Sequence, residues 1–263
     1  TAGALVVDLG CEQTNEACLR TFLGKQGGSA RIPVDWLTIQ KEGGAAATVK
    51  RAMDIASRRL AEANAWKRTA CPIRSLVIGS ECGASDTFSG LTANPLIGTV
   101  VDGVIAAGGR ALLTEFPEMV GAERVLMRRM RNRGVIAKFR RQMKWYQDLA
   151  QRLGVRMSDN LVPGNLAGGL INPCIKSLGS IVKGGTTAIE DVLDYGEEVS
   201  QPGLSLMQGP GNDPESVTGL AASGANLILF STGKGALSGS ALVPVVKISS
   251  SSDLYRRMPE DMD

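Results

Sequence analysis

The sequence predicts an α/β protein with α/β/α layers, built on mainly parallel sheets with long Gly-rich loops at the strand ends. Short apolar runs alternate with longer segments of helical periodicity along most of the 263 residues. The chain carries 32 glycines, which suit tight turns between strands and helices, and only 4% aromatic residues. A hydrophobic fraction of 43% is sufficient for the core of one large or two smaller domains.

Residues 1–70 predict a first α/β region. Gly10 and the pair Gly43-Gly44 break the pattern and separate strands from helices. The expected elements are a strand at 2–9, a helix from about Asn15, a strand at 34–40 and a helix at 45–64. The turn at 65–74, which contains Pro72, marks the boundary to the rest of the chain.

Strands and helices continue to alternate from residue 71 onward. The expected strands are 75–79, 110–114, 226–230 and 243–248, with short or irregular strands at 188–193 and 203–207. The expected helices are 95–107, 121–153 with a break near Gly134, and 213–224. Residues 158–187 are expected to form a Gly-rich loop region.

Charge and cysteine content exclude several classes of protein. A net charge of +3 favours a small anionic substrate over nucleic acid, and the basic segment 124–144 is interpreted as a solvated helical face. Five cysteines without a Cys-x-x-Cys pair predict a reduced, cytoplasmic chain. The longest apolar run, near 225–230, is too short to span a bilayer, so neither membrane nor export is expected.

The sequence contains no histidine. This excludes a Ser-His-Asp triad, a Cys-His pair and a His-ligated metal within the chain itself. Proton transfer must therefore use Asp, Glu, Lys, Tyr or Cys. A histidine, where the chemistry requires one, must come from another segment or subunit.

Polar side chains follow two of the expected strands at the point where each strand ends. Residues 81–95 combine carboxylates, hydroxyls and a thiol directly after the strand at 75–79. Glu115 and Glu118 follow the strand at 110–114. Parallel α/β sheets bind ligands at the carboxyl ends of their strands, so both groups are expected to face one cleft.

Two Gly-rich segments contain a lysine that could meet an anion. Ser231-Thr-Gly-Lys-Gly235 is typical of an anion nest, but it lacks the spacing of a P-loop, and a plain tight turn remains the alternative. The segment 164–169 is followed by Lys176, which could act as a base or bind a carboxylate. An exposed loop lysine is the alternative there. Cys11 and Cys82 each follow a strand and could share a metal, although buried packing is commoner for cysteine.

Several motifs together resemble the altronate/galactarate dehydratase family over nearly the whole chain. The motifs are Glu81-Cys-Gly-x-Ser-Asp86, Ser89-Gly-Leu-Thr-Ala-Asn-Pro95, Glu115-x-Pro-Glu118, Gly121-Ala-Glu123, Pro163-Gly-Asn-x-Ala-Gly-Gly169, Lys176-Ser-Leu-Gly179 and Thr232-Gly-Lys-Gly235. Gly10-Cys11-Glu12, Asp35-Trp-Leu-Thr-Ile-Gln40 and Asp261-Met-Asp263 extend the likeness. The resemblance implies that residues 1–70 are the tail of an upstream α/β domain and that residues 71–263 are the C-terminal catalytic-type α/β domain.

The resemblance implies dehydration of an aldonate or aldarate, such as altronate or galactarate, to a 2-keto-3-deoxy acid. It implies a divalent metal, typically Fe²⁺ with Mn²⁺ as an alternative, near Cys11 and Cys82. Lys176 would be the base or the carboxylate anchor, and Asp86 or Glu115 the acid or its supporting partner. The implied substrate-binding residues are Ser85, Ser89, Asn94, Asn165, Gly168, Gly169, Thr232, Gly233 and Lys234.

The chain departs from the family pattern at two positions near its lysines. Ile175 stands where the family usually has a glutamate beside Lys176, and Lys234 replaces the usual arginine, which removes a bidentate carboxylate contact. The family's His-containing motif would precede Thr1, and members continue past Asp263. We therefore expect a fragment or a shortened paralogue, with histidine supplied by an upstream segment or a small subunit, and a homo-oligomer is compatible with the pattern.

Two alternative functions remain at this point. One is a sugar-acid-binding paralogue without turnover, which Ile175 in the pocket beside Lys176 would favour and a compensating carboxylate there would oppose. The other is a C–S lyase, because the large subunits of sulfolactate sulfo-lyases resemble the same family. The run Glu118-Met-Val-Gly-Ala-Glu123 favours the sugar-acid branch.

Overall fold

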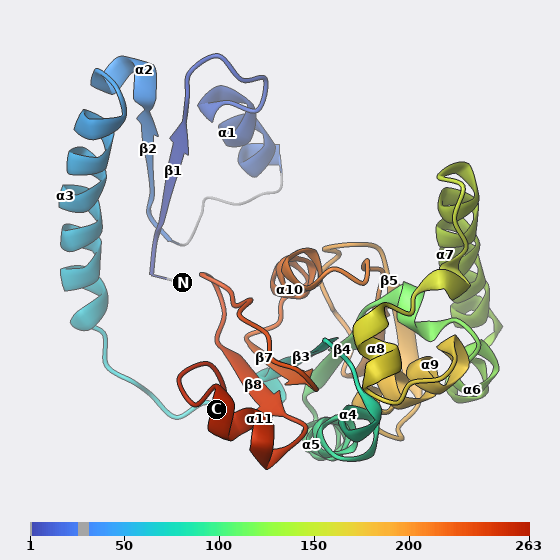
Figure 1. Ribbon diagram of the computed structural model, residues 1–263. Helices are drawn as coiled ribbons and strands as arrows, with labels where there is room; N and C mark the ends of the chain where they lie inside the picture. Colours follow the sequence, from blue (N-terminus) through green and yellow to red (C-terminus); the bar gives the residue numbers. More distant parts are fainter. Residues whose placement is uncertain (1, 26–31) are drawn as a thin grey trace. The chain divides into compact units, whose positions relative to one another are not determined.

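The computed structural model describes residues 2–25 and 32–263 of the chain. The chain divides into two compact units, Thr1–Ala70 and Cys71–Asp263, which we call unit 1 and unit 2 (Figure 1).

Unit 1 contains a two-stranded parallel sheet and three helices. The strands are β1 (Ala4–Asp8) and β2 (Val34–Thr38), and the helices are α1 (Glu16–Lys25), α2 (Ile39–Glu42) and α3 (Ala45–Asn64). Gly43 has a φ of 89°, which lets the chain turn from α2 into α3. Arg59 of α3 lies 2.8 Å from the carboxylate of Asp35 in β2 and fastens the helix to the sheet. The helix expected at 45–64 is confirmed.

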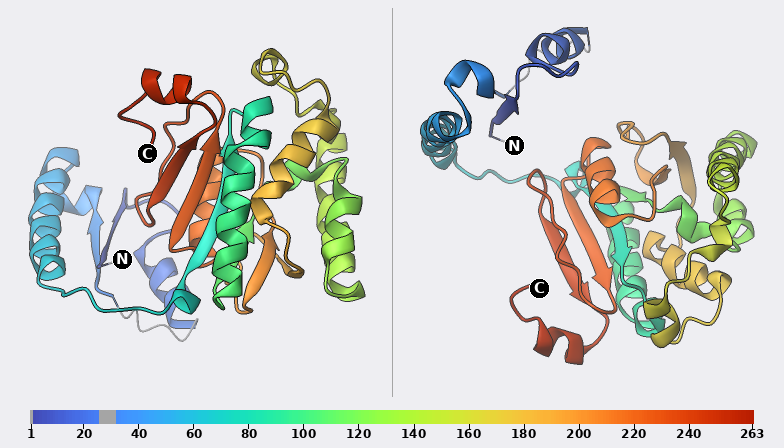
Figure 2. Two further views of the ribbon diagram at one scale, coloured as in Figure 1. Left: turned by 90° about the horizontal axis from the view of Figure 1, so that it is seen from below. Right: turned by 45° about the horizontal axis from the view of Figure 1, so that its top comes forward.

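A six-stranded, fully parallel sheet forms the centre of unit 2, in the order β5-β6-β4-β3-β7-β8 (Figures 1 and 2). The strands are β3 (Val77–Gly83), β4 (Arg110–Leu113), β5 (Ile189–Leu193), β6 (Gly203–Met207), β7 (Leu227–Thr232) and β8 (Val245–Ser249). Parallel neighbours need crossover connections. The connection from β3 to β4 contains helices, whereas β5 is joined to β6 and β7 to β8 by fully described segments without a helix. The predicted α/β class with mainly parallel sheets is thereby confirmed.

Helices pack on both faces of this sheet and enclose two hydrophobic cores. One core is formed with α5 (Ala93–Ala106), α6 (Glu123–Arg129), α7 (Arg133–Arg152) and α9 (Pro173–Ile181). The other is formed with α10 (Asp213–Ala222). The shorter helices are α4 (Thr87–Leu91), α8 (Pro163–Ala167) and α11 (Ser252–Arg257). The sheet is thus covered in layers, with β3 between β4 and β7 at its centre.

Strand β3 is longer than its sequence predicts. The expected strand ended at residue 79, whereas β3 continues to Gly83 and includes Glu81 and Cys82. Its last residues pair with β7, Cys82 beside Ser231 and Gly83 beside Thr232. This pairing across a central strand overrides the weak strand propensity of polar residues. Cys82 is therefore a strand residue, and the expectation of a turn there is wrong.

The region 158–187 is largely helical, which corrects the expected loop. Helix α9 begins at Pro173, where a missing N–H costs nothing, and the Asn172 side chain accepts a hydrogen bond from the Ile175 N–H at 2.9 Å. The chain continues into a short 3₁₀ turn, η4 (Val182–Gly184). The directions of the Lys176 and Lys183 side chains are therefore set by helical geometry.

The break in the long helical region lies at 130–132, before the expected position near Gly134. The Asn132 side chain accepts a hydrogen bond from the Gly134 N–H at 2.8 Å and so caps α7. Residues 188–193 and 203–207, expected to be irregular or short strands, contain β5 and β6. Ser251 caps α11, which the sequence analysis missed.

The expectation that the longest apolar segment lies near 225–230 is wrong. Among the described residues, the helical stretch Thr87–Ala106 has the length and apolar composition of a membrane span. It comprises α4 and α5, and within α5 the side chains of Ile97 and Val101 are fully buried in the core. One face of α5 therefore belongs to the core, while Leu91 and Leu96 of the same stretch are exposed.

A close backbone contact between α5 and η4 depends on Gly98. A Cβ at this position would lie 2.2 Å from the carbonyl oxygen of Val182. We expect Gly98→Ala to lower the free energy of unfolding by about 1–3 kcal/mol, since α5 and η4 would have to separate. Gly103→Ala is the matched control, because that residue lies in the same helix and a Cβ there meets nothing within 4 Å. It should be neutral or stabilise by up to about 1 kcal/mol. Urea unfolding measures both, and equal effects would contradict the steric argument.

Candidate active site

The carboxyl ends of β3 and β4 bring together polar residues that are distant in the sequence. Glu81 and Cys82 are among the last residues of β3, while Glu115 and Glu118 follow β4. Glu115 has a φ of 71°, a left-handed conformation that is uncommon for residues other than glycine. Strained backbone of this kind is often found at functional sites, where the surrounding packing maintains it.

Three of these side chains and two lysines form what we call the buried cluster: Cys82, Glu115, Glu118, Lys176 and Lys183. The ammonium nitrogen of Lys183, in η4, lies 2.6 Å from Glu115 Oε2 and 2.5 Å from Cys82 Sγ. The ammonium nitrogen of Lys176, in α9, lies 2.8 Å from Glu118 Oε1. Each lysine is thus paired with its own glutamate. All five side chains are buried, and Lys183 is 0% exposed.

Burial and neighbouring charges change the protonation of this cluster. Burial raises the pKa of the Cys82 thiol well above its usual range, and repulsion from Glu115 adds to the effect. Burial also raises the pKa of Glu115 to about 7, although the Lys183 ammonium acts in the opposite direction. For Lys183, burial lowers the pKa, but the charges of Cys82 and Glu115 outweigh burial and raise it above its ordinary value. Lys183 is therefore an ammonium at neutral pH, and Glu115 can gain or lose a proton there.

Glu81 is a second kind of buried acid at this edge of the sheet. It is 0% exposed, and neither of its carboxylate oxygens has a hydrogen-bond partner among the residues that the structure describes. Burial raises its pKa well above the usual range, and repulsion from Glu115 raises it further. Burial likewise raises the pKa of Asp213, at the start of α10, with Glu118 adding to the shift. Carboxylates thus outnumber the lysines here, and we expect Glu81 to be protonated.

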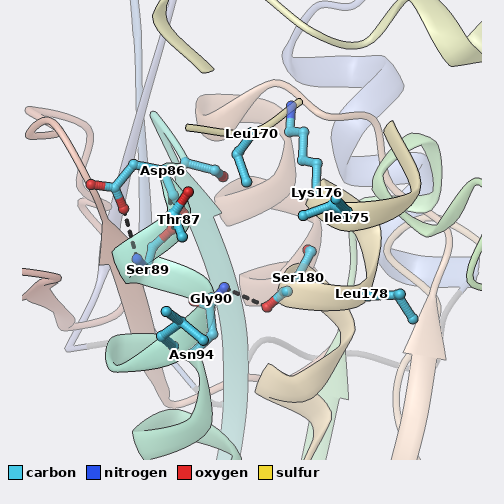
Figure 3. A pocket seen from close by; sticks show the side chains of 13 residues that line it. Asp86, Thr87, Ser89, Gly90, Asn94, Leu170, Ile175, Lys176, Leu178 and Ser180 are labelled. Atoms are coloured by element: carbon cyan, nitrogen blue, oxygen red, sulfur yellow. Dashed lines mark hydrogen bonds between the residues drawn. The ribbon is translucent and has the colours of Figure 1, made fainter. Parts of the chain in front are cut away.

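A pocket of about 270 Å³ opens between α4, α5 and α9 beside the buried cluster (Figure 3). Figure 3 places Lys176 and Ile175 together on α9, opposite Asp86, Thr87 and Ser89. The pocket is lined by hydroxyl groups as well as apolar atoms, and Lys176 and Ser180 lie in its wall. Ser180 Oγ accepts a hydrogen bond from Lys183 at 3.0 Å, so the pocket and the buried cluster are in direct hydrogen-bond contact.

Comparison with known families places both units. The family model described as "D-galactarate/Altronate dehydratase, C-terminal" matches residues 73–263. The model described as "D-galactarate dehydratase/Altronate hydrolase, second domain" matches residues 1–64. The chain belongs to the D-galactarate/altronate dehydratase family. This confirms the resemblance on which the residue assignments were based.

Individual members of the D-galactarate/altronate dehydratase family match at moderate identity. The altronate dehydratase of Bacillus subtilis is 42% identical over 75% of this chain and 39% of its own length. The altronate dehydratase of Escherichia coli is 37% identical over 100% of this chain and 52% of its own length. The galactarate dehydratase (L-threo-forming) of E. coli is 35% identical over 98% of this chain and 50% of its own length. The chain therefore spans about half the length of these relatives or less.

The family motif at 85–94 mixes pocket-lining and structural roles. Asp86 caps α4, since its Oδ1 accepts a hydrogen bond from the Ser89 N–H at 2.6 Å, and Ser89 Oγ accepts one from the Asp86 N–H at 3.1 Å. Asn94 donates to the Gly179 carbonyl at 2.7 Å and also bonds to Ser231. Ser85 Oγ lies 3.7 Å from Cys82 Sγ. Ser85, Asp86, Ser89 and Asn94 all line the pocket, but the Asp86 carboxylate is already engaged as a helix cap.

The family motif at 163–169 supports this pocket from behind. Asn165 donates to the Ser85 carbonyl at 2.8 Å, and its Oδ1 lies 3.4 Å from the Lys176 ammonium nitrogen. The Gly168 carbonyl accepts a hydrogen bond from the Thr87 N–H at 2.9 Å, and Gly169 has a left-handed φ of 87°. These predicted substrate-binding residues hold the pocket wall in place through contacts within the chain.

In the predicted anion nest, residues 231–235, two backbone N–H groups already donate hydrogen bonds within the chain. The Gly233 N–H donates to the Ala84 carbonyl at 3.2 Å, and the Gly235 N–H donates to Thr232 Oγ1 at 2.9 Å. A Cβ at Gly233 would lie 2.4 Å from the carboxylate carbon of Asp86. Lys234 approaches Gly164. The pocket of about 270 Å³, whose wall lies wholly among described residues, is not lined by Thr232, Gly233 or Lys234.

The family pattern implied a metal near Cys11 and Cys82. Cys11 is exposed in unit 1, whereas Cys82 is buried in unit 2. Within unit 2, the ligand atoms of Cys82, Glu115 and Glu118 lie within 4.8 Å of one another. A thiolate and two carboxylates are a donor set that iron or manganese accepts.

The position of Lys183 decides whether such a metal fits. A metal bonded to Cys82 and Glu115 at the usual distances of about 2.0–2.3 Å would overlap the Lys183 ammonium or face it at contact distance. That ammonium already lies 2.5 Å from the sulfur and 2.6 Å from the carboxylate oxygen. In the described arrangement the buried cluster therefore does not fit a divalent metal.

Sequence reasoning missed Lys183 and named Glu118 only as part of a motif. The missed signal was the spacing of Lys176, Ser180 and Lys183, which repeats every three or four residues and predicts a single helical face. The region 158–187 was expected to be a loop, so this spacing had no meaning there. Once α9 and η4 are helical, the two lysines lie along one side and both meet the strand ends.

Proposed function

We propose that this chain carries the substrate pocket of a sugar-acid dehydratase. This hydro-lyase converts an aldonate or aldarate, such as altronate or galactarate, to a 2-keto-3-deoxy acid. The observation that carries the proposal is a hydroxyl-lined pocket in direct contact with two buried lysine–glutamate pairs. The names of the relatives support the same reaction class.

The reaction removes a proton from the carbon next to a carboxylate and expels the neighbouring hydroxyl as water. The resulting enol then becomes the ketone. The proton is poorly acidic unless a positive charge stabilises the carboxylate as charge moves onto it. Lys176 lies in the pocket wall and is 7% exposed, so its ammonium is placed to bind the substrate carboxylate or, after losing a proton, to act as the base.

The departing hydroxyl requires a proton donor. Of the two predicted acids we favour Glu115, because its pKa of about 7 suits proton transfer at neutral pH. Lys183 and Ser180 connect it by hydrogen bonds to the pocket. Asp86 accepts a hydrogen bond from the Ser89 N–H, so we assign it a role in shaping the pocket and not in proton transfer. The hydroxyls of Ser85 and Ser89 and the amide of Asn94 are assigned to the substrate hydroxyls.

Other expectations for the enzyme remain predictions. They include a divalent metal, iron or manganese, with Cys11 as its remaining predicted ligand, because the surroundings of Cys82 do not fit one while Lys183 occupies them. They include a histidine from an upstream segment or a small subunit, a cytoplasmic location and a homo-oligomer. No step assigned above to Lys176 or Glu115 depends on any of them.

Binding without turnover is disfavoured by one contact. Ile175 does line the pocket beside Lys176, as that alternative requires. Glu118 nevertheless places a carboxylate 2.8 Å from the Lys176 ammonium, so this lysine keeps a charged partner without the motif glutamate. The pairing that a catalytic lysine needs is therefore present.

The proposal is tested with a panel of aldonates and aldarates, with sulfolactate included, assayed anaerobically with and without Fe²⁺. We expect 2-keto-3-deoxy product from at least one sugar acid. Release of sulfite from sulfolactate would indicate a C–S lyase instead. Thermal stabilisation by a sugar acid without any product would favour the binding paralogue, and neither binding nor product would overturn the proposal for this chain.

A further inference from the structure

Lys183 is, like Glu81, a fully buried ionisable residue of unit 2, and no motif assigned it a role. Its side chain is 0% exposed. Its ammonium makes three contacts: 2.5 Å to Cys82 Sγ, 2.6 Å to Glu115 Oε2 and 3.0 Å to Ser180 Oγ. An ammonium so placed uses all three of its N–H groups.

The position of this ammonium is that of a bound cation. It lies within reach of two of the three side chains whose ligand atoms are close enough to hold a metal, Cys82 and Glu115. The third, Glu118, is neutralised by Lys176 at 2.8 Å. The two glutamates are therefore matched by two lysines, and an added divalent ion would bring a charge that nothing in the cluster balances.

The backbone holds Lys183 in this position. Helix α5 packs closely on η4 at Gly98, where a Cβ would lie 2.2 Å from the Val182 carbonyl oxygen. Gly184 packs less closely on Leu113 of β4, where a Cβ would lie 3.1 Å from a methyl carbon. The turn that carries Lys183 is therefore packed tightly between α5 and β4.

We propose that Lys183 is a built-in cation that occupies the place of a metal between Cys82 and Glu115, so that a divalent ion binds there only when this ammonium is removed. The inference rests on contacts within unit 2 and does not depend on which reaction the chain catalyses.

The test uses Co²⁺, whose bond to a thiolate gives a charge-transfer absorption in the near ultraviolet. Cys11, Cys18, Cys71 and Cys174 are all exposed and are first replaced by serine, so that Cys82 is the only thiol. Co²⁺ is then titrated into this full-length background and into its Lys183→Met variant. Lys176→Met is the matched control, because it removes the other buried lysine and leaves Lys183 in place.

We expect the thiolate band to appear in Lys183→Met and to be absent, at the same Co²⁺ concentrations, from the protein that retains Lys183. Adding Cys82→Ser to that variant should remove the band. A band of equal affinity in the protein that retains Lys183 would overturn the proposal. So would a band in Lys176→Met that matches the band in Lys183→Met.

Lys183→Met could fail to fold, because it leaves Glu115 without its partner. Lys183→Met combined with Glu115→Gln then keeps the cluster neutral, and Co²⁺ should bind to its thiol and remaining carboxylate. Circular dichroism first establishes that each variant is folded. The protein with Lys183 intact decides independently: a thiolate band at micromolar Co²⁺ contradicts the inference, and its absence up to millimolar Co²⁺ supports it.

Discussion

Lys176→Met should abolish formation of the 2-keto-3-deoxy product, with kcat lowered by about 10²–10⁴-fold. The ammonium is the one cationic group in the described lining of the pocket, so its loss removes both the base and the carboxylate anchor. Lys144→Ala is the control, because that lysine is 71% exposed and pairs only with Asp148 on α7. Full activity in Lys176→Met would show that the reaction does not use this pocket.

The same substitution also affects folding, and the two effects can be separated. Removing Lys176 leaves Glu118 as a buried charge without its partner, which typically costs about 3–5 kcal/mol of unfolding free energy. Glu118→Gln conversely leaves the buried Lys176 ammonium without its carboxylate partner. The double variant removes both charges and should recover most of the lost stability while remaining inactive. A double variant that regains activity would assign Lys176 a purely structural role.

Lys176→Arg distinguishes the two chemical roles of the lysine. Arginine keeps the positive charge but is protonated at all accessible pH values, so it can bind a carboxylate and cannot serve as a base. Retained substrate binding, measured by thermal shift, with lost turnover identifies the base. Substantial retained turnover identifies the carboxylate anchor.

Glu81→Gln should stabilise the protein at pH 8 by roughly 3–5 kcal/mol, since keeping the glutamate protonated costs about 1.4 kcal/mol for each pH unit above its unfolded pKa. The native side chain is 0% exposed, and both oxygens lack partners within the described parts of the chain. Glutamine has nearly the same shape and cannot ionise. The variant is therefore more stable because it avoids the free energy that the glutamate requires either for a buried charge or for keeping its proton.

The pH dependence gives this prediction its sign. Burial raises the pKa of Glu81 in the folded protein above the unfolded value of 4.5. The folded state then binds more protons than the unfolded state, so the contribution of Glu81 to stability is complete below that value and is lost as the pH rises toward the folded pKa. The variant lacks this loss. The difference between the two proteins should be small at pH 4 and grow toward pH 8, and a difference that does not change with pH would refute the explanation.

The sequence predicted the fold class and the edge of the sheet at which the site lies. Periodicity located most strands of unit 2 because their apolar runs are buried on both faces, as in other parallel sheets. It placed Glu115 and Asp86 near one another through the rule that parallel strands end on a common edge. It stopped β3 at residue 79 because Ser80, Glu81 and Cys82 are polar or weakly apolar, and only pairing with β7 makes them strand residues.

The chemistry of the site depended on contacts that sequence patterns do not contain. The partner of Lys176 is Glu118, 58 positions away by numbering, and the two meet only because α9 packs on the turn that follows β4. Asp86 has the composition of a catalytic acid in the sequence, yet its position before α4 makes it a helix cap. Local spacing predicts caps and faces once the helices are known, whereas ion pairs between distant segments follow from the tertiary fold.

The central position of β3 also has a consequence for how the protein is made. One neighbour of β3, the strand β4, follows it within a few dozen residues, while the other, β7, is synthesised about 150 residues later, as in the pairing of Glu81 with Phe230. Contacts of such long sequence separation form slowly and close large loops. The pairing with β7 that keeps Glu81 and Cys82 in strand geometry therefore forms only at a late step of folding. A ribosome-bound or truncated chain that ends before β7 would have an open sheet edge at β3, where the finished protein has its active-site floor, and that edge would be the point at which chaperones or aggregation act.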